Sequence, residues 1–281
     1  MKKLIFSGQT FDIIGDSVDK LVIRGLTHIK NKGERISARG LTGLQAYNVN
    51  YVLVNPKNRI HWLRAPASVT YLSRELLMYF KGSLNIKGMG DLAKVWLEFT
   101  DAKGRINSNY GYYVFYQKTG DGISQYESVI NSLLKEPQSR RAVINIDSVK
   151  NKTNASKDIP CNIAIHFFIH KNYLSSVVFA RSIDVITGLP YDMGFFSFVT
   201  ELAYKDLKKR GLKKLKLGYC TIKCNLTQLY DTRLALAQKI HKKRESKEVN
   251  MPFIDSAKDV LKDIYQGSAH TKIIKWCYDH R

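Results

Sequence analysis

The sequence predicts an α+β fold in which a mixed β-sheet is packed by helices. Strand-like and helix-like segments follow one another without the regular alternation that a doubly wound sheet requires. The chain has 281 residues, of which 44% are hydrophobic, so it can bury a sizeable core. It contains no internal repeat and no low-complexity tract. We therefore expect residues 1–281 to form a single domain.

The N-terminal part of the chain is predicted to be mainly extended. Residues 3–24 place apolar residues before a Gly15-Asp16 turn signal, which favours a strand or a hairpin. Residues 33–45 are basic, rich in glycine and aperiodic, which indicates a loop that can hold phosphate. Residues 46–55 alternate between polar and apolar side chains and predict a strand.

The strongest helical signal covers residues 68–81. Apolar residues recur there at helical spacing, Ser68 or Thr70 can cap the N-terminus, and Gly82 lies just beyond the end. The second half is predicted to contain, in order, helix 123–135, strand 141–146, strands 162–170 and 173–180, helix 195–207, strand 215–222 and helix 225–241. Residues 171–172 form the turn of a hairpin. The basic segment 245–281 shows only a weak pattern.

The formal net charge of +21 admits either nucleic acid or small phosphorylated ligands as partners. The basic clusters, such as 208–216 and 239–244, are short and interleaved with apolar residues, as on solvated helix faces. No helix-turn-helix, zinc-finger or RNA-binding signature accompanies them. We therefore expect a basic surface that attracts anionic substrates, and we do not expect nucleic acid as a partner.

Composition also bears on location and on metals. No apolar run reaches the length of a membrane span, and the N-terminus lacks a signal-peptide pattern, so we expect a cytoplasmic protein without a membrane partner. Four cysteines in so long a chain indicate reduced thiols. The spacing of Cys220 and Cys224 is unusual for a metal site and no second ligand pair follows. We therefore expect no metal.

An ordered set of motifs surrounds Cys161. The cysteine follows Pro160 at the start of a predicted strand, and the segments Arg181-Ser182-Ile183-Asp184 and Gly188-Leu189-Pro190-Tyr191-Asp192 come later. Further motifs are Arg74-Glu75-Leu76-Leu77, Val95-Trp96, Asn109-Tyr110-Gly111, Ser139-Arg140-Arg141 and Gln228-Leu229-Tyr230. Together they resemble the thymidylate synthase superfamily over about residues 30–232, most closely its deoxycytidylate and cytidylate hydroxymethylase branch. Residues 245–281 match poorly.

The resemblance implies a fold, an oligomeric state and a set of site residues. It implies a thymidylate-synthase-like domain that forms a homodimer through its sheet, with Arg140 and Arg141 reaching the nucleotide of the neighbouring subunit. The implied catalytic residues are Cys161, Glu75, Asp192 and Tyr110. The implied substrate-binding residues are Arg39, Arg140, Arg141, Arg181, Ser182, Asp184, Gly188, Gln228 and Tyr230. Trp96, Asp184 and Gly188 are implied to bind the reduced folate, 5,10-methylenetetrahydrofolate.

The chemistry explains why these residue types are needed. Carbon 5 of a pyrimidine becomes nucleophilic only after a thiolate adds at carbon 6, which is the role of Cys161. A free thiol is mostly protonated at neutral pH, so a cation such as Arg181 is expected beside it. Glu75 can hold water or relay protons, and its place within an apolar helix should raise its pKa.

Position 192 is expected to select the base. The family's thymidylate synthases carry asparagine there, which matches uracil, whereas this chain has Asp192. A protonated aspartate can donate to N3 of cytosine and accept from its 4-amino group. The expected activity is therefore 5-hydroxymethylation of a cytidine 5′-monophosphate. We favour dCMP over CMP, although Gln228 replaces the usual sugar-binding histidine and leaves the sugar open.

Two alternatives remain at this point. The first is methylation of carbon 5 of dCMP or dUMP, which would use the same residues. The second is a non-catalytic relative that binds nucleic acid, which the high charge and the poorly matched C-terminal segment favour.

Overall fold

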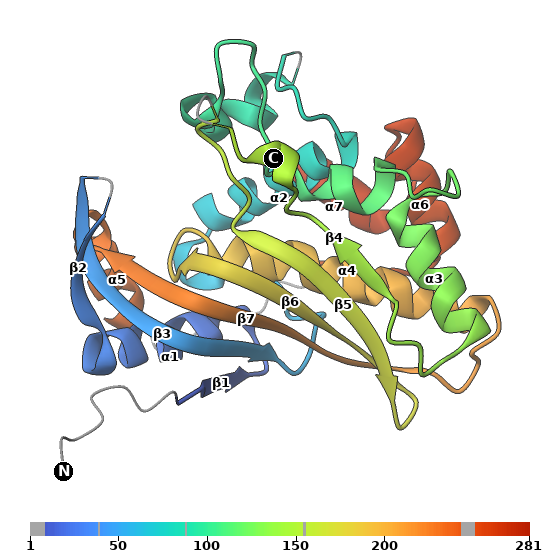
Figure 1. The fold of residues 1–281 in the computed structure, drawn as a ribbon, viewed down its shortest axis with the longest axis horizontal. Coiled ribbons are helices and arrows are strands. Elements are labelled where there is room, and N and C mark those ends of the chain that lie inside the picture. Colours follow the sequence, from blue (N-terminus) through green and yellow to red (C-terminus); the bar gives the residue numbers. More distant parts are fainter. Residues whose placement is uncertain (1–8, 39, 88, 154–155, 243–250) are drawn as a thin grey trace.

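The computed structural model describes residues 9–38, 40–87, 89–153, 156–242 and 251–281, and its centre is a seven-stranded mixed sheet (Figure 1). The strands are β1 (Phe11–Gly15), β2 (Glu34–Ala38), β3 (Leu41–Leu53), β4 (Val143–Asn145), β5 (Asn162–His170), β6 (Tyr173–Asp184) and β7 (Lys216–Tyr230). Their order is β1-β3-β7-β6-β5-β4, and β2 pairs with β3. The β1–β3 and β6–β7 pairs are parallel and the others are antiparallel. The predicted mixed sheet is confirmed.

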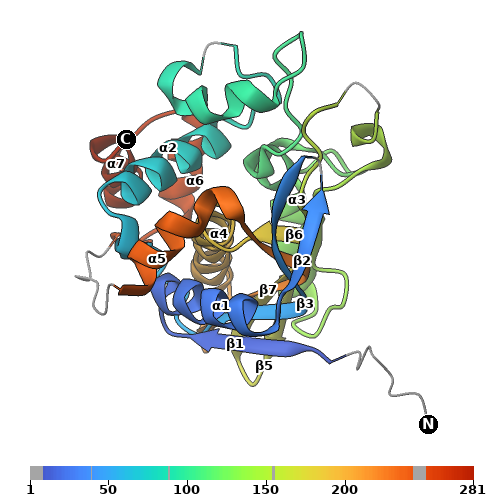
Figure 2. The same ribbon diagram turned by 90° about the vertical axis from the view of Figure 1, so that its left-hand side faces the viewer.

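Helices cover one face of this sheet in two layers (Figures 1 and 2). The helices are α1 (Val18–Lys32), α2 (Ala67–Lys81), α3 (Gln125–Lys135), α4 (Leu189–Lys209), α5 (Leu234–Lys242), α6 (Ala257–Gln266) and α7 (Lys272–Asp279). Helices α1 and α4 pack directly on the strands, and α2, α6 and α7 form the outer layer. Most of α4 is buried, because both its sheet side and its outer side are covered. No helix of the described residues is long and apolar enough to cross a membrane.

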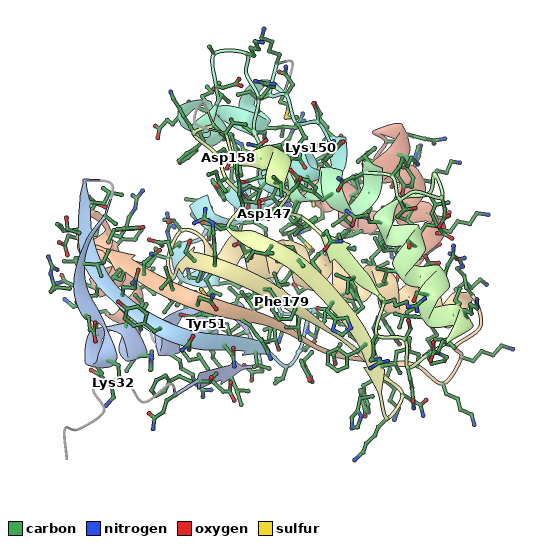
Figure 3. All side chains as sticks on the ribbon, in the orientation of Figure 1. Lys32, Tyr51, Asp147, Lys150, Asp158 and Phe179 are labelled. Atoms are coloured by element: carbon green, nitrogen blue, oxygen red, sulfur yellow. The ribbon has the colours of Figure 1, made fainter. Side chains whose placement is uncertain are left out.

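The opposite face of the sheet carries aromatic side chains that no other element of the described residues covers. Tyr173 and Phe179 of β6 and Tyr219 of β7 are 39–44% exposed, and Phe179 is labelled on the sheet in Figure 3. Their strand neighbours that point to the helices are fully buried, as Val178 and Ile222 show. This alternation leaves an apolar open face on a sheet whose other face is packed.

The N-terminal expectations were partly wrong. Residues 18–32 form helix α1, which begins after Ser17, whose side chain accepts a hydrogen bond from the backbone N–H of Lys20. Most of the loop expected at residues 33–45 is a pair of strands, since it contains β2 and the first residues of β3, whereas the strand predicted at residues 46–55 is confirmed as the rest of β3. The alternation that identifies strands is weak in this hairpin because β2 is mostly exposed on both faces.

The helix predicted at 68–81 is confirmed as α2, which ends at Gly82 in the left-handed conformation (φ 57°). Neither of the proposed caps was right, since Pro66 occupies the N-cap position and the Ser68 hydroxyl donates to the His61 carbonyl. The predicted helix at 123–135 is α3. The β5–β6 hairpin is also confirmed, with Lys171 and Asn172 at φ 48° and 63° in its turn.

The C-terminal expectations were wrong in two places. Residues 216–230 form the single long strand β7, so the first part of the helix expected at 225–241 is extended, and α5 begins at Leu234. The weakly patterned tail contains the amphipathic helices α6 and α7. Their apolar residues, such as Ile264 and Ile274, pack into the core against α2 and α4.

Candidate active site

A cavity of about 450 Å³ opens where the C-terminal ends of β6 and β7 meet α2, the start of α4 and the helical segment Gly90–Phe99. Eleven of the residues singled out in the sequence line it: Glu75, Trp96, Tyr110, Cys161, Arg181, Ser182, Asp184, Gly188, Asp192, Gln228 and Tyr230. These residues are scattered over more than half of the chain, and only the fold brings them to one place.

Cys161 lies in this cavity immediately before β5. Its sulfur receives a hydrogen bond from the Ser182 hydroxyl at 3.7 Å. Burial raises the pKa of the Cys161 thiol, while the positive charge of Arg181 acts in the opposite direction. Burial is the larger of the two effects. The expected help from Arg181 is therefore present but does not by itself make Cys161 a thiolate.

The Arg181 side chain holds the segment that leads into Cys161. Its Nε donates to the Pro160 carbonyl at 3.1 Å, and one terminal nitrogen donates to the Ile159 carbonyl at 2.8 Å. The other terminal nitrogen reaches the Ser182 hydroxyl at 3.2 Å. Since Arg181 also lines the cavity, one cation holds the segment before Cys161 and faces the cavity.

Asp192 enters the cavity from the first turn of α4, where its side chain is almost completely buried. The Asn162 amide nitrogen donates to Asp192 Oδ2 at 2.9 Å. Burial raises the pKa of Asp192 to about 7, although the hydrogen bond from Asn162 acts against this rise. The carboxyl is thus poised between its neutral and ionised forms near neutral pH.

Glu75 reaches the same cavity from α2. Tyr71 donates to Glu75 Oε1 at 3.3 Å, and Oε2 is buried without a hydrogen-bond partner among the described residues. Burial, reinforced by the negative charge of Asp192, raises the pKa of Glu75 to about 8. Two carboxyls that both hold protons near neutral pH can donate, accept or relay protons beside Cys161.

Tyr110 is placed by a turn that packs closely on α2. A side chain at Gly111 would meet the Tyr79 carbonyl, because an added Cβ would lie 1.9 Å from that oxygen. Asp158, labelled in Figure 3, fixes the other end of the turn. It accepts hydrogen bonds from the backbone N–H groups of Asn107 and Ser108, each at 2.7 Å. Sequence reasoning missed Asp158, since no motif marks a carboxylate that binds backbone N–H groups.

The turn between β6 and α4 is closed by Asp184. Its Oδ1 accepts from the backbone N–H groups of Ile186 and Thr187 at 2.8 and 2.6 Å, and Oδ2 is buried without a partner in the described structure. Gly188 follows and allows a close approach, because an added Cβ would lie 3.0 Å from the Asp184 carbonyl. This turn aims the start of α4, and therefore Asp192, into the cavity.

The remaining walls differ in character. On β7, Gln228 donates to Gln45 at 2.9 Å and accepts from the Tyr230 hydroxyl at 3.4 Å, which makes a polar wall. On the opposite side, Trp96 and Phe99 meet edge to face with ring centres 6.3 Å apart. Phe99 is 46% exposed beside the cavity, and such an aromatic pair suits a flat heteroaromatic ring.

Three predicted arginines are not placed in this cavity. Arg140 and Arg141 are exposed just before the edge strand β4 and do not line it. Arg39 lies outside the described residues, although its neighbours Ala38 and Leu41 line the cavity.

Comparison with known proteins accords with this geometry. The family model for thymidylate synthase matches residues 24–271. The chain belongs to the thymidylate synthase family. The confirmed mixed α+β fold is that of the family, whose members are one-carbon transferases that use a nucleoside monophosphate and methylenetetrahydrofolate.

Relatives of two kinds are similar to this family member. Deoxycytidylate 5-hydroxymethyltransferase of Enterobacteria phage T4 is 28% identical over 204 residues, which cover 69% of this chain and 79% of that protein. Thymidylate synthase of Wigglesworthia glossinidia brevipalpis is 29% identical over 131 residues, covering 46% and 49%. Thymidylate synthase of Buchnera aphidicola subsp. Acyrthosiphon pisum (strain APS) is 25% identical over 228 residues, covering 78% and 80%. These identities do not separate the two activities, so the base must be inferred from the site.

No group of three or more His, Cys, Asp or Glu residues in the described structure is arranged to hold a metal ion. Cys220 and Cys224 are both buried along β7, where burial raises the pKa of each thiol to about 11 and 12.

Proposed function

We propose that this protein hydroxymethylates carbon 5 of a cytidine 5′-monophosphate, with dCMP favoured over CMP and 5,10-methylenetetrahydrofolate as co-substrate. The observation that carries the proposal is Asp192, a buried carboxyl with a pKa of about 7 in the same cavity as Cys161. In its neutral form this carboxyl can donate to N3 of cytosine and accept from its amino group, and unlike an asparagine it makes this match depend on pH.

The site residues support attack on a cytosine ring. When the Cys161 sulfur bonds to carbon 6, the electron pair of the 5,6 double bond moves to carbon 5 and is shared with N3 through carbon 4. A neutral Asp192 donates a hydrogen bond to N3, where that negative charge builds up. The stabilisation at N3 compensates for the raised pKa of the Cys161 thiol, since the ring becomes a better acceptor for the few thiolates present.

Glu75 supports the steps that follow. The folate supplies a one-carbon unit at the oxidation level of formaldehyde. The ionised form of Glu75, whose pKa is about 8, is a stronger base than an ordinary carboxylate, so it can hold a water molecule and take the proton that the water gives up on attacking the new exocyclic carbon. The Trp96–Phe99 wall suits the flat ring of the folate, with Asp184 and Gly188 at the adjoining turn.

The proposal includes a homodimer with shared sites. The open face of the sheet exposes Tyr173, Phe179 and Tyr219, and a second copy is the occupant that covers the same apolar face on both subunits. Arg140 and Arg141 are exposed beside the edge strand β4 and are free to reach a partner's nucleotide. Arg181, and Arg39 by its resemblance, complete the proposed phosphate site. We also propose that the chain acts as a single domain in the cytoplasm.

The test is an incubation with methylenetetrahydrofolate and dCMP, CMP or dUMP in separate reactions, with product masses as the readout. A 5-hydroxymethyl product from dCMP, formed by the wild type and not by Cys161→Ser, is expected. A methyl product together with dihydrofolate would favour the thymidylate-synthase-type reaction, which the similarity to thymidylate synthases suggests. Turnover of dUMP alone would overturn the cytosine assignment. No turnover, together with salt-sensitive binding of mixed-sequence oligonucleotides, would favour the non-catalytic alternative.

A further inference from the structure

We propose that Asn162 decides which oxygen of Asp192 keeps its proton and thereby makes this carboxyl select cytosine over uracil. The inference rests on the proposed function and goes beyond it, because Asp192 alone does not explain the choice of base. Asn162 directly follows the nucleophile Cys161, and neither its motif nor its position marked it in the sequence.

A neutral carboxyl is ambiguous towards pyrimidines. It has one donor and one acceptor, as an amide does. In one arrangement the hydroxyl donates to N3 of cytosine and the carbonyl accepts from the 4-amino group. In the reverse arrangement the carbonyl accepts from N3–H of uracil and the hydroxyl donates to O4. Something beside Asp192 must therefore hold the proton on one oxygen.

Asn162 is positioned to hold the proton on one oxygen of Asp192. Its side chain is 0% exposed, and its amide nitrogen donates to Asp192 Oδ2 at 2.9 Å. An oxygen that accepts this hydrogen bond serves as the carbonyl, so the proton of the neutral form stays on Oδ1. Asn162 itself does not line the cavity. The amide thus fixes which oxygen of the carboxyl acts as the acceptor and does not itself contact a ligand.

Asn162 acts on the base through Asp192. The Cys161 sulfur attacks carbon 6, and Asp192 reads the edge that contains N3 and the substituent of carbon 4. In the proposed arrangement the protonated Oδ1 of Asp192 donates to N3, and Oδ2, which Asn162 holds as an acceptor, faces the substituent of carbon 4.

A donor and an acceptor in fixed positions then face the base. Asp192 Oδ2 accepts one N–H of the cytosine amino group, and Asp192 Oδ1 donates to N3. With uracil, Oδ2 meets O4, which has no hydrogen to offer, and the proton on Oδ1 meets N3–H. A buried site that leaves polar atoms unpaired with the wrong base can discriminate by about 10³ to 10⁴.

Exchanging the two side chains is the sharpest test. In the double variant Asn162→Asp/Asp192→Asn the formal charge is unchanged, but the new carboxyl at position 162 can only draw the amide nitrogen of position 192 towards itself. The amide oxygen at position 192 then faces N3, which suits N3–H of uracil. We expect the double variant to prefer dUMP by about tenfold or more, and Asp192→Asn alone to keep a reduced preference for dCMP, because Asn162 still draws the amide oxygen of position 192 towards itself.

The experiment measures binding of dCMP and dUMP by equilibrium dialysis and kcat/KM for both nucleotides, with circular dichroism to verify folding. If the double variant still prefers dCMP, the role of Asn162 is refuted while the proposed function stands. If the wild type prefers dUMP, the proposed function itself fails. Should the double variant not fold, Asn162→Ala replaces it. That variant should lose about tenfold or more of the dCMP preference through weaker dCMP binding, and an equal loss for both nucleotides would show a merely structural role.

Discussion

The pH dependence of turnover follows directly from the buried carboxyl beside Cys161. With a pKa of about 7, Asp192 is about nine-tenths neutral at pH 6 and about one-hundredth neutral at pH 9. In the proposed reaction cytosine requires the neutral carboxyl, whereas attack requires the Cys161 thiolate. The pKa of the Cys161 thiol is raised from the ordinary 9.0. The wild-type kcat/KM for dCMP should therefore rise to about pH 7 and then level off, because each gain in thiolate is offset by an equal loss of neutral Asp192.

The variant Asp192→Asn removes one of these two titrations. Its kcat/KM for dCMP should keep rising about tenfold per pH unit up to about pH 9, so the ratio of variant to wild type grows about 50-fold between pH 7 and 9, as the neutral fraction of Asp192 falls from about one-half to about one-hundredth. At pH 6 the variant should be slower than the wild type by about 10- to 100-fold. The reason is that an amide donates a weaker hydrogen bond to N3 than a carboxyl, a loss of about 1.5 to 3 kcal/mol.

The assay is release of tritium from carbon 5 of labelled dCMP at constant ionic strength. Glu75 is present in both proteins, so most of its own titration cancels in the ratio. The rate of Cys161 alkylation by iodoacetamide reports the thiolate independently, and it should rise with pH in both proteins. A ratio that stays constant from pH 6 to 9 would refute the requirement for a neutral Asp192.

Two further predictions concern assembly and stability. The variants Cys161→Ser and Arg141→Ala should each be inactive alone. Refolding the two variants together should restore about a quarter of wild-type activity, because half of the dimers are mixed and each mixed dimer has one intact site out of two. No recovery of activity would contradict shared sites. The folded protein keeps a proton on Asp192 up to about pH 7, whereas an unfolded aspartate loses it near pH 3.8, so stability should fall as the pH rises between these values. By pH 8 this loss amounts to about 4 kcal/mol, and Asp192→Asn should then resist urea better than the wild type at pH 8 but not at pH 4.

The sequence predictions were correct where the signal for an element lies within that element's own segment. The β5–β6 hairpin needs only two alternating strands and the turn at Lys171 and Asn172, and it was predicted within a few residues. Helix α2 likewise carries its apolar spacing and Gly82 within one segment. By contrast, residues 225–230 read as helix because their extended state is imposed by pairing with β3 on one side and β6 on the other.

The C-terminal segment illustrates the same limit. Helices α6 and α7 bury Ile264 and Trp276 against α4 and α2, which are distant in the sequence. Isolated helices of 10 and 8 residues are marginal in water, so their own pattern is a weak signal. Packing against α2 and α4 supplies the stability that the local sequence lacks.

The sequence by itself determined which chemical groups this family member carries: a thiol at Cys161, carboxyls at Glu75 and Asp192, and an arginine at Arg181. The order of these residues along the chain was enough to predict that they belong to one site. The tertiary structure decided the state of each group, since it raises the pKa of the thiol and of both carboxyls by burial and places Asn162 against Asp192. A pKa depends on the solvent that is excluded and on the charges and donors within a few ångströms, and those neighbours come from segments that only folding brings together.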